Sequence, residues 1–201
     1  MIAGNNLEQM GSEEVDDDLM LRVAKRDGEA FRILVDRHAD VAFRIGCRIV
    51  GDSIEAEDIA QETLLRLWNN ADKWIPGGSG VAAWLSRVAT NLCLDRLRKK
   101  KRTSEEDVPD EADKAPLADE LIDEDRQGEA VKKCIGKLGD RQKAAVVLTY
   151  YEEQPNLEAA KMLKMKIKAF ESLLYRARGS LKDCLENNPI IRSARGGIDN
   201  G

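Results

Sequence analysis

The residue types that most often carry catalysis or bind metals are scattered along this chain of 201 residues. Its four cysteines, Cys47, Cys93, Cys134 and Cys184, form no C-x-x-C pair, and His38 is the single histidine. A zinc site or a disulfide framework needs clustered ligands or paired spacings, so we expect the cysteines to be small core residues. The sequence also offers no nucleophile beside a base and no phosphate-binding loop, so we expect no enzyme activity and no cofactor. Function is therefore expected in charged surfaces that bind partners.

The first such surface lies on a helix predicted from Asp52 to Trp68. Asp52 can accept a hydrogen bond from a free N–H of the first turn, and Glu55 follows at capping-box spacing. Apolar residues recur at helical spacing on one side, namely Ile59, Leu64, Leu67 and Trp68, and polar residues on the other, namely Asp58, Gln61, Glu62 and Arg66. A polar face of this kind is usually only solvated, and the helix taken alone leaves that interpretation open.

A second predicted helix, from Val81 to about Arg102, combines polar and basic side chains. Arg87, Asn91 and Arg98 fall on one face, where arginine can hold phosphate and asparagine can pair with a base edge. The helix ends in six basic residues out of seven, from Arg96 to Arg102. The helix dipole explains one or two of these charges but not six, so a phosphate backbone is the expected partner.

The segment between these helices, residues 69–80, is predicted to be an exposed loop because Pro76 and three glycines interrupt any helix. Trp74 within it could be a stacking surface for a base. A packing role is at least as good an interpretation.

Beyond the second helix, the chain is expected to contain a linker and a second domain. Eleven acidic residues and a single lysine occupy residues 105–125, a composition that cannot pack a core. The sequence thus predicts an all-α protein with two small helical domains joined by an acidic flexible linker. The expected segments are a disordered tail (1–17), a first domain (18–102), the linker (103–126), a second domain (127–186) and a flexible tail (187–201).

The second domain contains the spacing of a helix-turn-helix. A short helix is predicted from Asn156, a turn at residues 164–166, and a longer helix from Ile167 to about Leu185. From Lys161 to Lys182 there are seven basic residues and one acidic residue, inside a chain of formal net charge -5. Such local positive charge indicates DNA as the partner.

Two groups of motifs carry a resemblance to a known family. A-E-D-I-A-Q-E-T-L-L-R-L-W, the Gly-rich loop and V-A-A-W-L-S-R-V-A-T-N-L-C-L-D-R-L-R together resemble region 2 of the extracytoplasmic-function sigma factors of bacterial RNA polymerase. L-G-D-R-Q-K-A-A-V-V-L-T-Y-Y-E and F-E-S-L-L-Y-R-A-R resemble region 4 of the same family. Where its members usually have Ser or Thr and then often Gly at the start of the recognition helix, this chain has Lys166 and Lys168, so the ordinary cap is missing.

The resemblance implies a role for each charged face. Asp58, Gln61 and Glu62 would dock on RNA polymerase. The melted promoter -10 strand would be held by Arg87, Asn91, Arg98 and Lys99, while the loop before the second helix holds a flipped base. The -35 duplex would be met by Lys168, Ser172, Tyr175, Arg176 and Arg178.

The resemblance also implies partners and a location. Core RNA polymerase would be contacted at the clamp helices of its largest subunit and the flap of its second largest subunit. Promoter DNA and an anti-sigma factor would be further partners, and the expected setting is a stress response. Because the sequence shows no signal peptide and no apolar run of membrane length, we expect a cytoplasmic location without membrane insertion. The alternative is a stand-alone helix-turn-helix regulator whose first domain is an effector or dimerisation module.

Overall fold

The computed structural model describes residues 14–106, 125–189 and 191, and within these ranges it contains helices and no strand. The first domain comprises α1 (Asp16–Val23), α2 (Gly28–Val50), α3 (Ser53–Asn69), the 3-10 turn η1 (Ala71–Lys73) and α4 (Gly80–Glu106). The second comprises α5 (Asp125–Gly136), α6 (Asp140–Val146), the π-helical turn η2 (Val147–Tyr151), α7 (Asn156–Met162) and α8 (Ile167–Glu186). The all-α prediction is confirmed. Among the described helices, none is both long and apolar enough to cross a bilayer.

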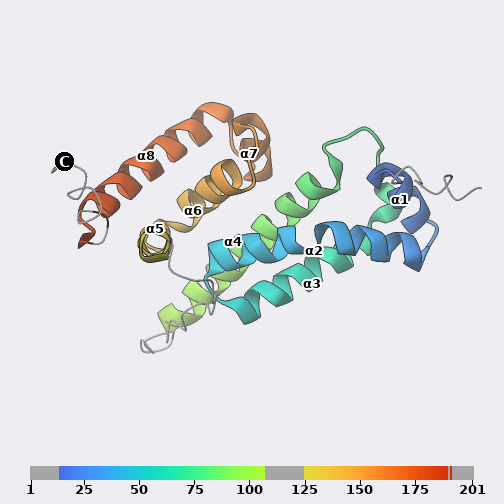
Figure 1. Ribbon diagram of the computed structural model, residues 1–201, viewed down its shortest axis with the longest axis horizontal. Coiled ribbons are helices and arrows are strands. Elements are labelled where there is room, and N and C mark those ends of the chain that lie inside the picture. The colour runs from blue at the N-terminus through green and yellow to red at the C-terminus, as the bar shows by residue number, and fades with distance from the viewer. Residues whose placement is uncertain (1–13, 107–124, 190, 192–201) are drawn as a thin grey trace, which may run out of the picture.

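The first domain is built around α2, which packs against α1, α3 and α4 (Figure 1). Its core is formed by aliphatic side chains such as Leu34, Ile45 and Ile59, all buried. The crossing of α2 and α3 is close, because a Cβ at Gly46 would lie 2.8 Å from the Cβ of Ala56. Gly51 ends α2 with φ 81°, as predicted for a left-handed cap. This tight packing leaves the outer side of α3 to the solvent.

The start of α3 follows the sequence prediction in part. The Asp52 side chain accepts a hydrogen bond from the Glu55 backbone N–H at 2.9 Å. The Glu55 carboxylate does not complete the reciprocal bond of a capping box; its Oε1 instead lies 2.9 Å from the Lys100 ammonium. An ion pair to α4 therefore replaces half of the expected cap.

The predicted disordered tail extends too far at its C-terminal end. Helix α1 begins at Asp16. The Asp16 carboxylate accepts a hydrogen bond from the Arg37 guanidinium at 2.9 Å and lies 2.6 Å from Nε2 of His38. Residues 16 and 17 are thus helical because contacts from α2 and the loop hold them, and the sequence pattern around them did not reveal those contacts. The remainder of that tail, residues 1–13, lies outside the described residues.

The predicted linker, residues 103–126, is likewise too long at both ends. Helix α4 continues to Glu106 and α5 begins at Asp125, so the expected linker overlaps both helices. Residues 107–124, which hold most of its acidic side chains, lie outside the described residues, as does most of the predicted C-terminal tail.

The second domain contains the predicted helix-turn-helix, in which α7 packs on α8 and α8 packs on α6. Phe170 is fully buried and is the largest fully buried side chain of the described residues. The prediction that all four cysteines are isolated core residues is wrong for two of them, since Cys134 of α5 and Cys184 of α8 form a disulfide. Their separation of 50 residues gave no local spacing signal, and only the packing of α5 on α8 brings them together. Cys93 is a buried core residue, as expected, and Cys47 is partly exposed.

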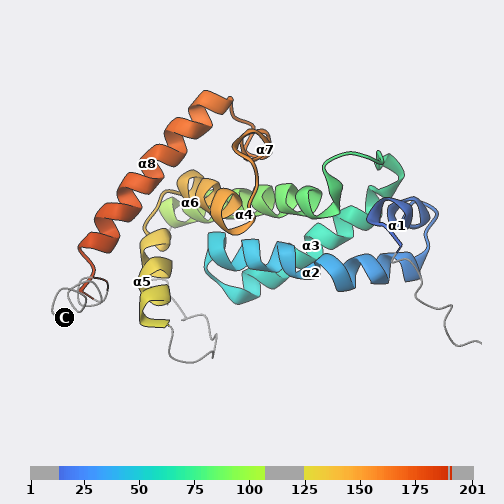
Figure 2. The ribbon, with the colours of Figure 1, turned by 45° about the horizontal axis from the view of Figure 1, so that its top comes forward.

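The two domains touch where α6 lies against α2 and α4, η2 against α2, and α7 against α4 (Figures 1 and 2). The side chain of Glu152 is only 5% exposed, and its oxygens lie 3.5 Å from Arg44 and 3.8 Å from Arg48. The Lys143 ammonium donates to the Ile49 carbonyl at 3.2 Å. Helix α8 lies on the far side of α6 from α2, so its outer face is open to a partner (Figures 1 and 2).

Candidate functional site

Helix α3 presents the predicted acidic surface to solvent. Buried Ile59 and Leu67 fix the rotation of the helix and leave Asp58, Gln61 and Glu62 on its outer side, the first two exposed and the third partly exposed. The Asp58 carboxylate lies 3.3 Å from Arg96 of α4, and Glu62 lies 2.7 Å from Arg66. Exposed ion pairs of this kind contribute little to stability, so both carboxylates can change partner.

An apolar residue belongs to the same surface and was missed by the sequence prediction. Leu65 follows Asp58 by seven residues and Glu62 by three, which places it on their side of α3, and it is 53% exposed. Its signal was present in the sequence as an apolar residue outside the buried stripe. The acidic surface thus combines charge with an exposed leucine, a composition suited to a protein partner.

The residues of α4 that were predicted to hold the melted DNA strand lie on two sides of the helix. Arg87, Asn91 and Arg98 lie on one side of the helix, and the Asn91 amide donates to the Arg87 carbonyl at 2.7 Å. Arg98 is paired with Asp95 at 2.5 Å. Lys99 is exposed but follows Arg98 directly, about 100° round the helix. The structure therefore brings the first three together and places Lys99 beside them.

The loop between η1 and α4 is held by α1. One carboxylate oxygen of Asp17 accepts the Trp74 indole N–H at 2.8 Å, and the other accepts the Gly77 backbone N–H at 2.8 Å. These two donors, Gly77 first and then Trp74, lower the pKa of Asp17 below its ordinary value. The structure thus favours the packing interpretation of Trp74. Asp17 was missed by the sequence prediction because it fell in the expected tail.

Replacing Asp17 with alanine is expected to loosen this loop. The Gly77 amide should exchange with solvent several-fold faster, and Trp74 fluorescence should shift to longer wavelength, because both N–H groups lose their acceptor. Asp18→Ala, a change at the exposed neighbouring carboxylate, is the control. Equal exchange of the Gly77 amide in the two variants would contradict the contact.

The same contact makes stability depend on pH. Because the folded-state pKa of Asp17 is lowered, the contribution of this carboxylate to stability is complete above the ordinary value of 3.8 and disappears only as pH falls through the lower folded-state pKa.

The outer face of α8 carries the predicted duplex-binding residues. Phe170, Leu173, Leu174 and Ala177 are buried against the domain. The opposite side exposes Lys168, Ser172, Tyr175, Arg176 and Arg178, and all but Lys168 line a shallow depression together with Glu171. Tyr175 is 71% exposed, an unusual position for an aromatic side chain without a partner surface.

The start of α8 lacks the ordinary cap. Lys166 occupies the N-cap position and makes no side-chain hydrogen bond to the first turn, as the sequence predicted. The first-turn N–H groups of α8 and the exposed side chains of Lys166 and Lys168 together place positive charge at the start of this helix.

Comparisons with known proteins match both domains. The family model for Sigma-70 region 2 matches residues 34–103, and that for Sigma-70, region 4 matches residues 128–181. The ECF RNA polymerase sigma factor SigW of Bacillus subtilis is 30% identical over 177 residues, covering 83% of this chain and 94% of that protein. SigE of Mycolicibacterium smegmatis is 32% identical over 156 residues, covering 76% of this chain, and the match spans 60% of that relative's length.

Two solved structures share the fold. CnrH in complex with the cytosolic domain of CnrY has a TM-score of 0.63 and 24% identity, covering 87% of this chain and 99% of that one. The sigma factor RpoE in complex with the anti-sigma factor NepR from Bartonella quintana has a TM-score of 0.61 and 21% identity, covering 79% of this chain and 98% of that one. With both regions matched in order and SigW similar over nearly its whole length, the chain belongs to the extracytoplasmic-function family of RNA polymerase sigma factors.

Proposed function

We propose that this chain binds core RNA polymerase and directs it to promoters as an alternative sigma factor. The observation that carries the proposal is the pair of exposed faces on the two domains, one acidic on α3 and one basic on α8. The acidic face suits a protein partner, and the basic face suits a DNA duplex. The chain does no covalent chemistry in this scheme, and it acts in the cytoplasm, where polymerase and promoters meet.

Region 2, residues 18–102, would engage both polymerase and melted DNA. Asp58, Gln61 and Glu62 dock on the clamp helices of the largest subunit, with Leu65 covered in the contact. Phosphates and bases of the opened -10 strand are held along α4 by Arg87, Asn91, Arg98 and Lys99. The loop anchored by Asp17 borders this strand.

Region 4, residues 127–186, would place α8 in the major groove of the -35 element. Arg176, Arg178 and Lys168 are suited to phosphate contacts, which position the helix. Ser172 and Tyr175 lie nearer the base edges, where sequence is discriminated. The second domain also meets the flap of the second largest polymerase subunit.

Removing two arginines from α8 is expected to weaken promoter binding in a salt-dependent way. Arg176→Ala with Arg178→Ala should lower the affinity of the reconstituted holoenzyme for promoter fragments. The slope of log K against log salt should fall by about 1 for each phosphate that the variant no longer neutralises. The matched control removes two exposed cations of the first domain, Lys25 and Arg32, and should leave the slope unchanged. An unchanged slope in the α8 variant would remove α8 from the DNA interface.

An anti-sigma factor is the further partner that we propose, on the basis of the related RpoE, whose structure was solved with one. The rival function, a stand-alone regulator, is separated by footprinting on promoter fragments. A sigma factor should protect specific DNA only with core polymerase present, whereas a regulator should protect its operator alone.

A further inference from the structure

One acidic side chain lies within the basic outer face of α8. Glu171 is exposed and lines the shallow depression of this face. It is the single acidic residue between Lys161 and Lys182, against seven basic ones. Among the residues that the structure describes, none forms a hydrogen bond or an ion pair with its carboxylate. The carboxylate is therefore available to a partner that binds this face.

Neither the helix dipole nor a helical ion pair accounts for Glu171. It is the fifth residue of α8, and the favourable effect of a helix N-terminus on an anion falls off within the first turn. Lys168 precedes it by three residues but does not pair with it. Glu158 and Lys161 of α7, at the same spacing but with the acid first, pair at 2.8 Å. The stability of α8 alone thus does not explain this residue.

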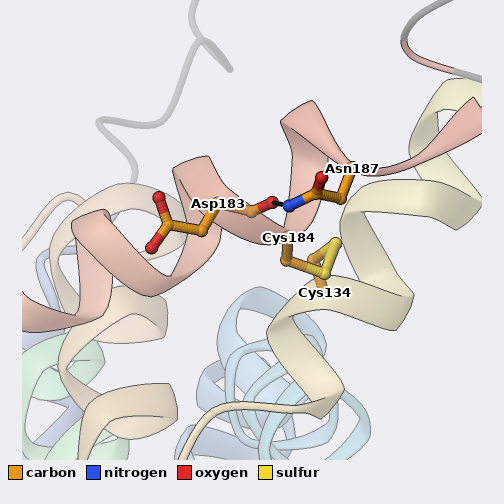
Figure 3. Close-up of a disulfide and its surroundings, with 4 residues drawn as sticks. All are labelled: Cys134, Asp183, Cys184 and Asn187. Atoms are coloured by element: carbon orange, nitrogen blue, oxygen red, sulfur yellow. Dashed lines mark hydrogen bonds between the residues drawn. A yellow bond between two sulfur atoms is a disulfide. The ribbon is translucent and has the colours of Figure 1, made fainter.

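The packing of α8 fixes which way Glu171 faces. Buried Phe170 holds the N-terminal half of the helix against the core, and the disulfide from Cys184 to Cys134 of α5 ties its C-terminal end (Figure 3). Glu171 lies one turn before exposed Tyr175 on the outer side. In a helix-turn-helix, the N-terminal residues of the second helix contact base edges in the major groove. Glu171, in the second turn, lies in this part of α8.

The neighbouring polar groups are partly used within the helix itself. The Ser172 hydroxyl donates to the Lys168 carbonyl at 2.9 Å, and Nε of Arg176 donates to the Ser172 carbonyl at 3.3 Å. Ser172 therefore keeps only the acceptor lone pairs of its hydroxyl for a base. Glu171 offers two acceptor oxygens, and a charged acceptor makes a stronger hydrogen bond than a neutral one.

We propose that Glu171 recognises a cytosine of the -35 element by accepting a hydrogen bond from its N4 amino group. This inference rests on the proposed function, because it takes the -35 duplex as the partner of α8. In the major groove cytosine presents the N4 donor, whereas guanine presents only acceptors and thymine presents an acceptor and a methyl group. Adenine has an N6 donor, but its N7 acceptor lies beside that donor and repels a carboxylate. The DNA backbone offers no alternative contact, because phosphates and a carboxylate repel each other.

The test selects bound DNA from a promoter library randomised across the -35 element, using holoenzyme reconstituted from the full chain and core polymerase. The wild type should enrich cytosine at one position of one strand, at least about fivefold over guanine and thymine. Glu171→Gln keeps the shape of the side chain and removes its charge. Because glutamine pairs with N6 and N7 of adenine, the preference at that position alone should move from cytosine to adenine. A partial loss of folding would weaken binding to all sequences and would not move one preference.

Asp183→Asn is the matched control. Asp183 is also exposed on α8, but it lies beside Cys184 near the end of the helix (Figure 3). The substitution changes the charge equally and should keep the wild-type preference at every position. An unchanged preference in Glu171→Gln, or an equal change at all positions, would overturn the inference and leave the proposed function intact.

The same selection without core polymerase separates the inference from the proposed function. If the chain alone enriches a cytosine, and Glu171→Gln moves that preference to adenine, the proposed function fails while the assignment of Glu171 stands. If the wild type enriches no base with or without polymerase, both are wrong.

Discussion

Reversing two charges on α3, with Asp58→Lys and Glu62→Lys, is expected to abolish binding to core RNA polymerase while leaving the chain folded. The two side chains are 60% and 43% exposed, and each makes one surface ion pair, so the loss of folding stability should not exceed about 1 kcal/mol. In the docked complex the same change places two positive charges against a polymerase surface that is complementary to negative charges. We expect affinity for core polymerase to fall at least about 100-fold, which corresponds to roughly 2.7 kcal/mol. Titration of the labelled chain with core polymerase measures this affinity.

A matched control separates this specific effect from the change in net charge. Glu29 and Asp36 of α2 are also exposed and pair with Arg32, so Glu29→Lys with Asp36→Lys changes the net charge equally on another helix. This control should bind polymerase like the wild type. If both double variants lose affinity equally, or neither does, α3 is not the docking surface.

Truncating Phe170 to alanine is expected to unfold the second domain selectively. Phe170 is fully buried within the small core shared by α6, α7 and α8, so the lost burial and the remaining cavity should cost about 3–5 kcal/mol. A domain of this size has a small free energy of unfolding, so a loss of this magnitude is enough to unfold it. Urea unfolding followed by circular dichroism should show a loss of helix from residues 127–186 at low denaturant, with the first domain unfolding later.

Tyr175→Ala provides the control on the same helix. Tyr175 is 71% exposed, so its truncation should change the free energy of unfolding by less than about 0.5 kcal/mol. It should still impair recognition of the -35 element if the outer face of α8 binds DNA. Equal destabilisation by the two variants would contradict the assigned orientation of α8.

Features with a strong local signal were predictable from sequence. Apolar spacing placed α3 and α8, and Gly51 marked the end of α2. The missing cap at Lys166 was also visible, because no residue there has a short polar side chain. Each of these properties depends on residues within a few turns of one helix, where periodicity and capping chemistry decide the outcome.

Features that depend on distant segments were not predictable in the same way. Asp17 reaches Trp74 across 57 residues, and the Cys134–Cys184 bond spans 50. Glu152 is buried against Arg44 and Arg48 of the other domain, although its sequence neighbours suggest an exposed acid. In each case tertiary packing selects the partner, and no spacing within the chain encodes it.

The most direct test of the account is reconstituted transcription from genomic promoter fragments with core RNA polymerase, with and without this chain. We predict that specific transcripts appear only when the chain is added, and that they disappear with the α3 double variant although it remains folded. Specific binding of the chain to DNA by itself, with core polymerase adding no transcript, would contradict the account and identify a stand-alone helix-turn-helix regulator instead.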